Sequence, residues 1–359
     1  MKIPLTSIAW FRNFALIAIS TSLISGCEDR RDSTVEISGK TMGTTYHIKL
    51  VSDEIDSGTL KIDIDERLVQ LNQVFSTYIP DSELTLLNRG NGAIQVSREL
   101  MNVLSLSSEI HHLSGGAFDP TVGPLVNLWG FGPSGPRNGV PSDEEISQAM
   151  ARAGFTRLAL QELTITKPRD LVIDLSAIAK GYAVDVISDY LDAMGEHRYL
   201  VEIGGEVRAS GTNDRHVPWV IGIEAPDMEV RRLQRSVPIR NMGMATSGDY
   251  RNFFEHEGQV YSHTLNPKTG WPVTHNLASV TVIHPRAGYA DGLATAFSVM
   301  GEAATMELAE ANKLLVLAII RDQGTYKEVM STELNRYLAG ITGKKNETLN
   351  EALNEALIK

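Results

Sequence analysis

Two oxygen-bearing side chains stand four residues apart in the segment GYADGLATAFSVMG, residues 288–301. On a helix, Asp291 and Thr295 would lie one turn apart and face the same way. Their immediate neighbours are apolar, which predicts that this helix is largely buried. An oxygen pair without nitrogen or sulfur ligands nearby suits a hard cation such as Mg²⁺ rather than Zn²⁺. The spacing therefore indicates a candidate magnesium site.

A second segment could bind a phosphate group. The sequence DLSAIAKGY, residues 174–182, passes from an expected strand into an expected helix. The start of a helix offers free backbone N–H groups and a positive dipole end, which favour an anion. Lys180, one turn into that helix, would add a point charge. The competing interpretation is an ordinary solvated lysine near a helix start.

Four further stretches are rich in glycine, hydroxyl groups or turn-forming residues. GGAFDPTVGPLVNLWG (115–130) is suited to close backbone approach, and EIGGE (202–206) places two glycines inside an expected strand, as a bulge or a bound ligand would require. TSGDYR (246–251) and HTLNPKTG (263–270) combine hydroxyls with an Asp, a His and a Lys. A structural loop and a structural histidine are the competing interpretations.

The elements that must position these groups mix helix and strand without regular alternation. Strands are expected over residues 35–51 with a break at 42–44, and over 158–166, 171–175, 199–209, 219–224 and 315–321. Helices are expected over 97–113, 142–153, 177–194, 290–300 and 303–312, and around the buried face Ile64, Leu68, Leu71 and Phe75. This irregular order predicts an α+β fold rather than a doubly wound sheet.

The N-terminus has the pattern of an export signal over residues 1–26, in which Lys2 and Arg12 precede an apolar run. That run ends in LISGC, and Cys27 is the only cysteine of the chain. The pattern favours a lipidated Cys27 over an uncleaved anchor, an exposed thiol or an intermolecular disulfide. A short tether over residues 27–34 and a polar tail over 343–359 would then flank one domain over 35–342.

The expected location is outside the cytoplasm, with the chain attached by lipid to a membrane facing the periplasm. The acidic residues Glu28 and Asp29 after Cys27 favour the inner membrane. The formal net charge of −11 argues against nucleic acid, or an anionic membrane surface, as the main partner. A phosphate ligand must therefore be bound locally, by a metal or by backbone amides.

Six motifs follow one another between residues 35 and 340. In chain order they are MGTTY from Met42, GAFDPTVGPLVNLWGFG from Gly116, DLSAIAKGY from Asp174, EIGGE from Glu202, TSGDYRNF from Thr246, and HTLNPKTG from His263 with YADGLATA after it. Together they resemble the ApbE family of flavin transferases, many of which are exported lipoproteins. The resemblance implies a single domain of mixed strands and helices, with the FAD and metal site in a cleft.

The resemblance also implies the residues of that site. Ala177 would give a backbone carbonyl to Mg²⁺, joined by the side chains of Asp291 and Thr295. The flavin dinucleotide would be bound by residues from several motifs, namely Met42, Tyr78, Ala117, Phe118, Asp119, Asp174, Lys180 and Leu265.

The implied reaction is the transfer of FMN from FAD to a threonine of an acceptor flavoprotein, with release of AMP. A base must take the threonine proton, and His263 is the candidate because it is the only histidine inside a matched motif. Asp249 or a metal-bound hydroxide are the alternatives. The implied acceptors are flavoprotein subunits of sodium-pumping NADH:quinone oxidoreductase or Rnf-type complexes, in which a Ser/Thr-Gly-Ala-Thr-like motif carries the threonine.

Two other functions use the same residues. An FAD pyrophosphatase would use water as the nucleophile and release FMN and AMP. A periplasmic flavin-binding lipoprotein would hold the flavin without turnover. The Asp291 and Thr295 pair argues against simple binding, because binding alone does not require a metal at the pyrophosphate.

Overall fold

The computed structural model describes residues 32–227, 232–249 and 253–341. These residues belong to one compact unit. The expected export signal, the lipidated Cys27 and the polar tail over 343–359 lie outside the described residues and stay predictions. Within the described part, no helix combines the length and the apolar character that are needed to cross a membrane.

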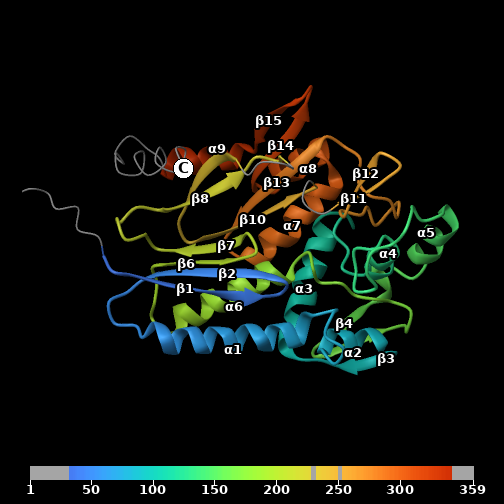
Figure 1. Ribbon diagram of the computed structural model, residues 1–359, viewed down its shortest axis with the longest axis horizontal. Helices are drawn as coiled ribbons and strands as arrows, with labels where there is room; N and C mark the ends of the chain where they lie inside the picture. The colour runs from blue at the N-terminus through green and yellow to red at the C-terminus, as the bar shows by residue number, and fades with distance from the viewer. Residues whose placement is uncertain (1–31, 228–231, 250–252, 342–359) are drawn as a thin grey trace, which may run out of the picture. The chain divides into compact units, whose positions relative to one another are not determined.

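The central element is an eight-stranded sheet in which every neighbouring pair is antiparallel (Figure 1). In spatial order its strands are β1 (Thr34–Thr41), β2 (Thr44–Val51), β6 (Tyr199–Ile203), β7 (Glu206–Ser210), β10 (Met242–Gly248), β13 (Leu277–His284), β14 (Leu315–Asp322) and β15 (Thr325–Met330). Among the described residues, three smaller sheets accompany it. The combination of antiparallel sheets and separate helices confirms the α+β prediction.

Both faces of this sheet are covered. One core contains residues of the sheet and of α1 (Ser57–Phe75), α3 (Arg98–Leu113), α6 (Ala179–Ala193) and α7 (Ala287–Met300). A second core contains residues of the sheet and of β8 (Trp219–Glu224), β9 (Leu233–Ile239) and α9 (Thr332–Ile341). Along β14 the side chains alternate between the two cores, as a pleated strand requires. Strands in the middle of the sheet are therefore apolar on both sides.

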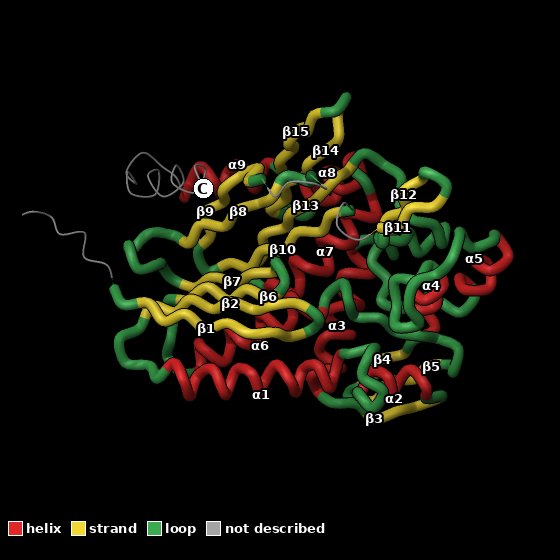
Figure 2. Tube along the Cα trace, in the orientation of Figure 1, coloured by secondary structure: helices red, strands yellow, loops and turns green. Residues whose placement is uncertain are grey.

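The remaining elements are short. They are α2 (Glu83–Arg89), β3 (Gly92–Gln95), α4 (Gly123–Leu128), α5 (Asp143–Met150), the 3₁₀ helix η1 (Phe155–Arg157), β4 (Ala159–Gln161), β5 (Thr164–Lys167), β11 (Phe253–His256), β12 (Gln259–Ser262) and α8 (Glu302–Ala311). A third apolar cluster joins Leu125, Trp129, Ile146 and Leu265, with Tyr261 of β12 against it. Figure 2 shows the β11–β12 hairpin on the same side as α4 and α5.

Several expected elements are confirmed. The face Ile64, Leu68, Leu71 and Phe75 is buried on α1. The capping box of Ser142 is also present, because its side chain accepts from the backbone N–H of Glu145 and the Glu145 carboxylate accepts from the backbone N–H of Ser142. Amphipathic spacing and capping residues were sufficient to predict these helices, because both signals are local in sequence.

Three strand predictions were wrong. Residues 158–166 form nearly the whole β4–β5 hairpin rather than one strand. In residues 171–175 the only bridge is the isolated one between Val122 and Val172. Residues 199–209 are also a hairpin. Gly204 and Gly205 form its turn, with φ angles of 61° and 103°, so the two glycines of EIGGE end strand β6 rather than interrupt it.

Candidate functional site

A cleft of about 1210 Å³ brings together the residues that the sequence predicted for FAD and Mg²⁺ binding and the candidate base His263. Its lining includes Met42, Tyr78, Ala117, Phe118, Asp119, Asp174, Ala177, Lys180, His263, Leu265, Asp291 and Thr295. These residues come from the β1–β2 turn, the loop between α1 and α2, the loops before α4 and α6, helices α6 and α7, and the segment after β12. Residues more than 200 positions apart in sequence, such as Met42 and Thr295, therefore line the same cleft.

The contact between α6 and α7 positions the candidate metal ligands. The backbone N–H of Gly181, in the first turn of α6, donates to Oδ2 of Asp291 at 3.0 Å. Asp291 thereby satisfies an N–H group at the start of α6 that has no partner within the helix. Ala177 lies two residues before α6, and Thr295 lies one turn after Asp291 on α7. All three line the same cleft.

Glycine at position 181 is required for this contact. A Cβ atom there would lie 2.5 Å from the carbonyl oxygen of Ala287 and 2.7 Å from Cβ of Asp291. Both distances are shorter than nonbonded atoms tolerate, so only glycine lets α6 and α7 approach this closely. The close approach is what places the Asp291 carboxylate, which is 5% exposed, beside the start of α6.

The chemistry of these donors fits a hard cation. Asp291 supplies a carboxylate, Thr295 a hydroxyl and Ala177 a backbone carbonyl, and oxygen donors of this kind suit Mg²⁺. No group of three His, Cys, Asp or Glu side chains among the described residues could hold a metal. A cation at this position would therefore need further oxygen ligands from water or from a bound phosphate.

Glu206 is a residue of the cleft that the sequence prediction missed. Its side chain is 7% exposed, and its Oε1 atom lies 3.3 Å from the ammonium nitrogen of Lys180. Its Oε2 atom is buried and has no hydrogen-bond partner among the described residues. Burial raises the pKa of Glu206 to about 8, against the attraction of Lys180. The available signal was its position directly after the glycine pair of EIGGE.

Two predicted aspartates shape loops with their carboxylates. Oδ1 of Asp119 accepts from the backbone N–H and the hydroxyl of Thr121 at 2.8 and 2.6 Å, and Oδ2 accepts from the N–H of Phe155 at 3.3 Å. Oδ1 of Asp174 accepts from the backbone N–H of Ser176 at 2.8 Å and from its hydroxyl. These bonds fix the two loops that border the cleft.

The aromatic and apolar lining differs in exposure. Tyr78 is 68% exposed, so its ring is available to stack on a planar ligand. Phe118 and Leu265 are buried. Met42 has a φ angle of 47° in the turn between β1 and β2. The cleft thus offers an accessible ring and a rigid apolar wall in addition to its polar groups.

His263 directly follows β12 and is half-buried in the cleft. Its ring lies 6.3 Å from that of Phe131 at an interplanar angle of 75°. The alternative base, Asp249, is bound by the guanidinium group of Arg321 at 2.5 and 2.9 Å and does not line the cleft. The carboxylate of Asp249 is thus occupied by Arg321 at a position outside the cleft lining. His263 is therefore the better placed of the two.

The fold and the site together define a class of protein. A helix start with a lysine suits a phosphate, the oxygen donors suit a hard cation, and the exposed aromatic ring suits a planar base or flavin. The volume is sufficient for a dinucleotide. The cleft therefore has the composition of a site for a phosphate-bearing aromatic ligand with a bound divalent cation.

Comparison with known proteins identifies the family. The model of the ApbE family matches residues 42–320, and the chain belongs to this family. A protein of Vibrio cholerae named FAD:protein FMN transferase is 43% identical, over 91% of this chain and 99% of its own length. A protein of the same name from Haemophilus influenzae is 40% identical, over 85% of this chain and 92% of its own length.

Two solved structures are similar over most of the chain. The flavin transferase ApbE from Vibrio cholerae has a TM-score of 0.77 and 42% identity, with 85% of this chain and 99% of that chain covered. The apo form of the Pseudomonas stutzeri flavinyl transferase ApbE has a TM-score of 0.79 and 38% identity, with 86% and 98% covered. The family model's match to residues 42–320 contains every described residue that lines the cleft.

Proposed function

We propose that this chain is an FAD:protein FMN transferase that moves FMN from FAD to a threonine hydroxyl of an acceptor protein, depends on Mg²⁺ and releases AMP. The activity is that of relatives which match the chain over nearly their full length. One observation carries the finer proposal. The bond between Gly181 and Asp291 brings the three candidate magnesium ligands and Lys180 into the cleft that His263 also lines.

In the proposed reaction the threonine oxygen attacks the phosphorus on the FMN side of the pyrophosphate. A new oxygen–phosphorus bond forms, the bond to the bridging oxygen breaks, and AMP leaves with that electron pair. His263 takes the threonine proton. Lys180 attracts the pyrophosphate oxygens, and the exposed ring of Tyr78 stacks on a planar part of FAD.

Magnesium would be held by the carbonyl of Ala177 and the side chains of Asp291 and Thr295. Bound there, it would neutralise charge that develops on the phosphate oxygens. Lys180 alone is a poor substitute because its ammonium group is already paired with Glu206.

The test is direct transfer in solution. The protein without its first 27 residues is incubated with FAD, MgCl₂ and a soluble acceptor domain that carries a Ser/Thr-Gly-Ala-Thr motif. Mass spectrometry of the acceptor should show the addition of one FMN, at the threonine. An acceptor of unchanged mass, while FAD is cleaved to FMN and AMP, would replace this proposal by the pyrophosphatase.

We also propose that the chain is exported and anchored by lipid at Cys27, on a membrane facing the periplasm, where it modifies subunits of NADH:quinone oxidoreductase or Rnf-type complexes. The support is the LISGC sequence and the lone cysteine. Cys27→Ser should leave an unprocessed precursor in cells. Soluble, unmodified mature protein in wild-type cells would refute the anchor.

A further inference from the structure

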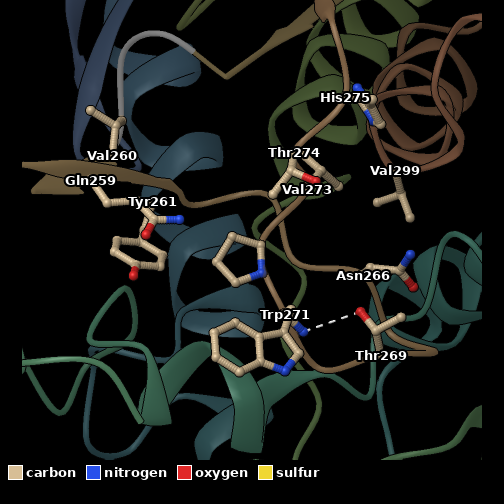
Figure 3. Close-up of a pocket in the computed structure, with 11 residues that line it drawn as sticks. Gln259, Val260, Tyr261, Asn266, Thr269, Trp271, Val273, Thr274, His275 and Val299 are labelled. Carbon is tan, nitrogen blue, oxygen red and sulfur yellow. Dashed lines mark hydrogen bonds between the residues drawn. The ribbon is translucent and has the colours of Figure 1, made fainter. Parts of the chain in front are cut away.

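A second pocket has a volume of about 460 Å³, and Figure 3 shows the residues that line it. Strand β12 forms one side with Gln259, Val260 and Tyr261, and the chain from Trp271 to His275 forms another. Val299 lines both the pocket and the cleft, so the two cavities share a wall. None of the described residues that line this pocket is an Asp, Glu, Lys or Arg.

The segment 263–275 separates the two cavities. It folds back on itself, since the N–H of Val273 donates to the carbonyl of Thr264 at 3.0 Å and the N–H of Asn266 donates to the carbonyl of Trp271 at 2.8 Å. His263 and Leu265 on its first arm line the cleft, whereas Trp271 on its second arm lines the pocket. Whatever binds in the pocket is therefore one chain segment away from the proposed base.

The pocket follows the edge of β12 rather than one of its faces. Successive side chains of a strand point to opposite faces, yet three consecutive residues, 259–261, all line the pocket. Among the described residues β12 pairs only with β11. Its other edge is therefore open to strand addition.

The hairpin register indicates which backbone groups this open edge presents. Glu257 and Gly258 form a two-residue turn with φ angles of 51° and 78°, and His256 pairs with Gln259 across it. Hydrogen-bonded and non-hydrogen-bonded pairs alternate along an antiparallel ladder, so the next pair, Glu255 with Val260, is non-hydrogen-bonded. The N–H and C=O of Val260 then point away from β11, along the pocket.

We propose that this pocket binds the extended segment of the acceptor protein that carries the target threonine, by strand addition to β12; this rests on the transferase activity proposed above. β12 ends at Ser262 and His263 follows it, so a segment paired along β12 continues toward the proposed base. The uncharged lining fits an uncharged segment, and Val260, 53% exposed, offers it an apolar contact.

Val260→Pro tests the strand addition, because proline removes the N–H that faces the pocket and leaves the bonds between β11 and β12 in place. Glu255→Pro is the matched control, since it loses the equivalent N–H on the opposite edge of the same hairpin. With a soluble acceptor domain carrying a Ser/Thr-Gly-Ala-Thr motif, the acceptor KM should rise about tenfold in Val260→Pro, the scale of one lost hydrogen bond, and stay near wild type in Glu255→Pro. FAD affinity should be unchanged in both.

Thr274→Arg provides a second test, because Thr274 is exposed and lines the pocket across from β12. It should raise the acceptor KM without changing FAD affinity. An unchanged KM in Val260→Pro and Thr274→Arg, or an equal rise in Val260→Pro and Glu255→Pro, would overturn the pocket assignment. Failure of the proposed function is distinct, because the wild-type protein itself would then transfer no FMN to the acceptor.

Discussion

The ammonium nitrogen of Lys180 lies 3.3 Å from a carboxylate oxygen of Glu206 on the wall of the cleft. Burial opposes the charge of Lys180, but the carboxylates of Asp291 and Glu206 outweigh it and raise the pKa of the lysine. Burial also raises the pKa of Asp291. Without a ligand, the cleft thus holds two buried carboxyl groups around one ammonium group, which favours a bound proton or a bound cation.

This pair predicts how the stability of the ligand-free protein depends on pH. The pKa of Glu206 is about 8 in the folded chain and ordinarily 4.5, so the folded state binds the proton more tightly than the unfolded state. The stabilisation is complete below pH 4.5 and is lost as the pH rises through 8. Each pKa unit corresponds to about 1.4 kcal/mol. Urea unfolding in EDTA should show a free energy of unfolding that decreases over this range.

Glu206→Gln should flatten that decrease, because the amide does not titrate. Glu202→Gln is the matched control, since Glu202 belongs to the same motif but lies on β6. Its side chain is more exposed than that of Glu206, and it pairs with His47. If the pH dependence survived in Glu206→Gln but disappeared in Glu202→Gln, Glu202 would be the titrating group and the prediction for Glu206 would be wrong.

The sequence predicted the helices of this fold better than its strands. The period of α1 and the capping box of α5 are local signals, and both were confirmed. The β6–β7 hairpin was missed because two alternating segments joined by glycines look the same whether the glycines lie in a bulge or in a turn. Only the positive φ angles of Gly204 and Gly205 distinguish the two.

The sequence indicated which residues line the cleft, but not which of them contact one another. The residues named for FAD and Mg²⁺ binding, together with His263, line one cleft. However, the partner of Lys180 is 26 positions away on β7, and the partner of Asp291 is a backbone N–H on another helix. Neither pairing has a signal in the spacing of one segment, because each depends on how distant elements pack.

Removal of the Asp291 carboxylate should reduce turnover far more than FAD affinity. The reason is that Mg²⁺ mainly stabilises charge that develops during transfer. Asp291→Ala should therefore lose most of kcat, whereas Thr295→Val, which loses one neutral ligand, should lose less. Steady-state kinetics with FAD binding measured by fluorescence separates the two effects. Full activity of the wild type in excess EDTA would contradict the role of the metal.

Gly181→Ala should separate α6 from α7. The added Cβ would lie 2.5 Å from the carbonyl oxygen of Ala287, so one helix must shift, at a cost of about 1–3 kcal/mol. Urea unfolding measures this loss. The matched control is Gly340→Ala on α9, where a Cβ meets nothing within 4 Å and helix propensity should improve. Equal stability of the two variants would show that the α6–α7 contact does not require glycine.

The choice of nucleophile separates transferase from hydrolase. A protein-bound threonine competes with water at about 55 M, so transfer dominates only if docking aligns the hydroxyl, an effect that can amount to about 7–11 kcal/mol. Without acceptor, AMP release should be slow. With acceptor, AMP and acceptor-bound FMN should form in equal amounts, and threonine-to-alanine substitution in the acceptor should abolish both. Chromatography of AMP and mass spectrometry of the acceptor measure the two products.

His263→Ala tests the proposed base in the same assay. Loss of a general base typically slows a reaction by about 10² to 10⁴, and FAD should still bind because the other cleft residues are unchanged. Asp249→Asn is the informative comparison, since Asp249 is paired with Arg321 and does not line the cleft. Its transfer rate should stay close to that of the wild type, because this side chain does not line the cleft. A large loss in Asp249→Asn with little change in His263→Ala would reverse the assignment of the base.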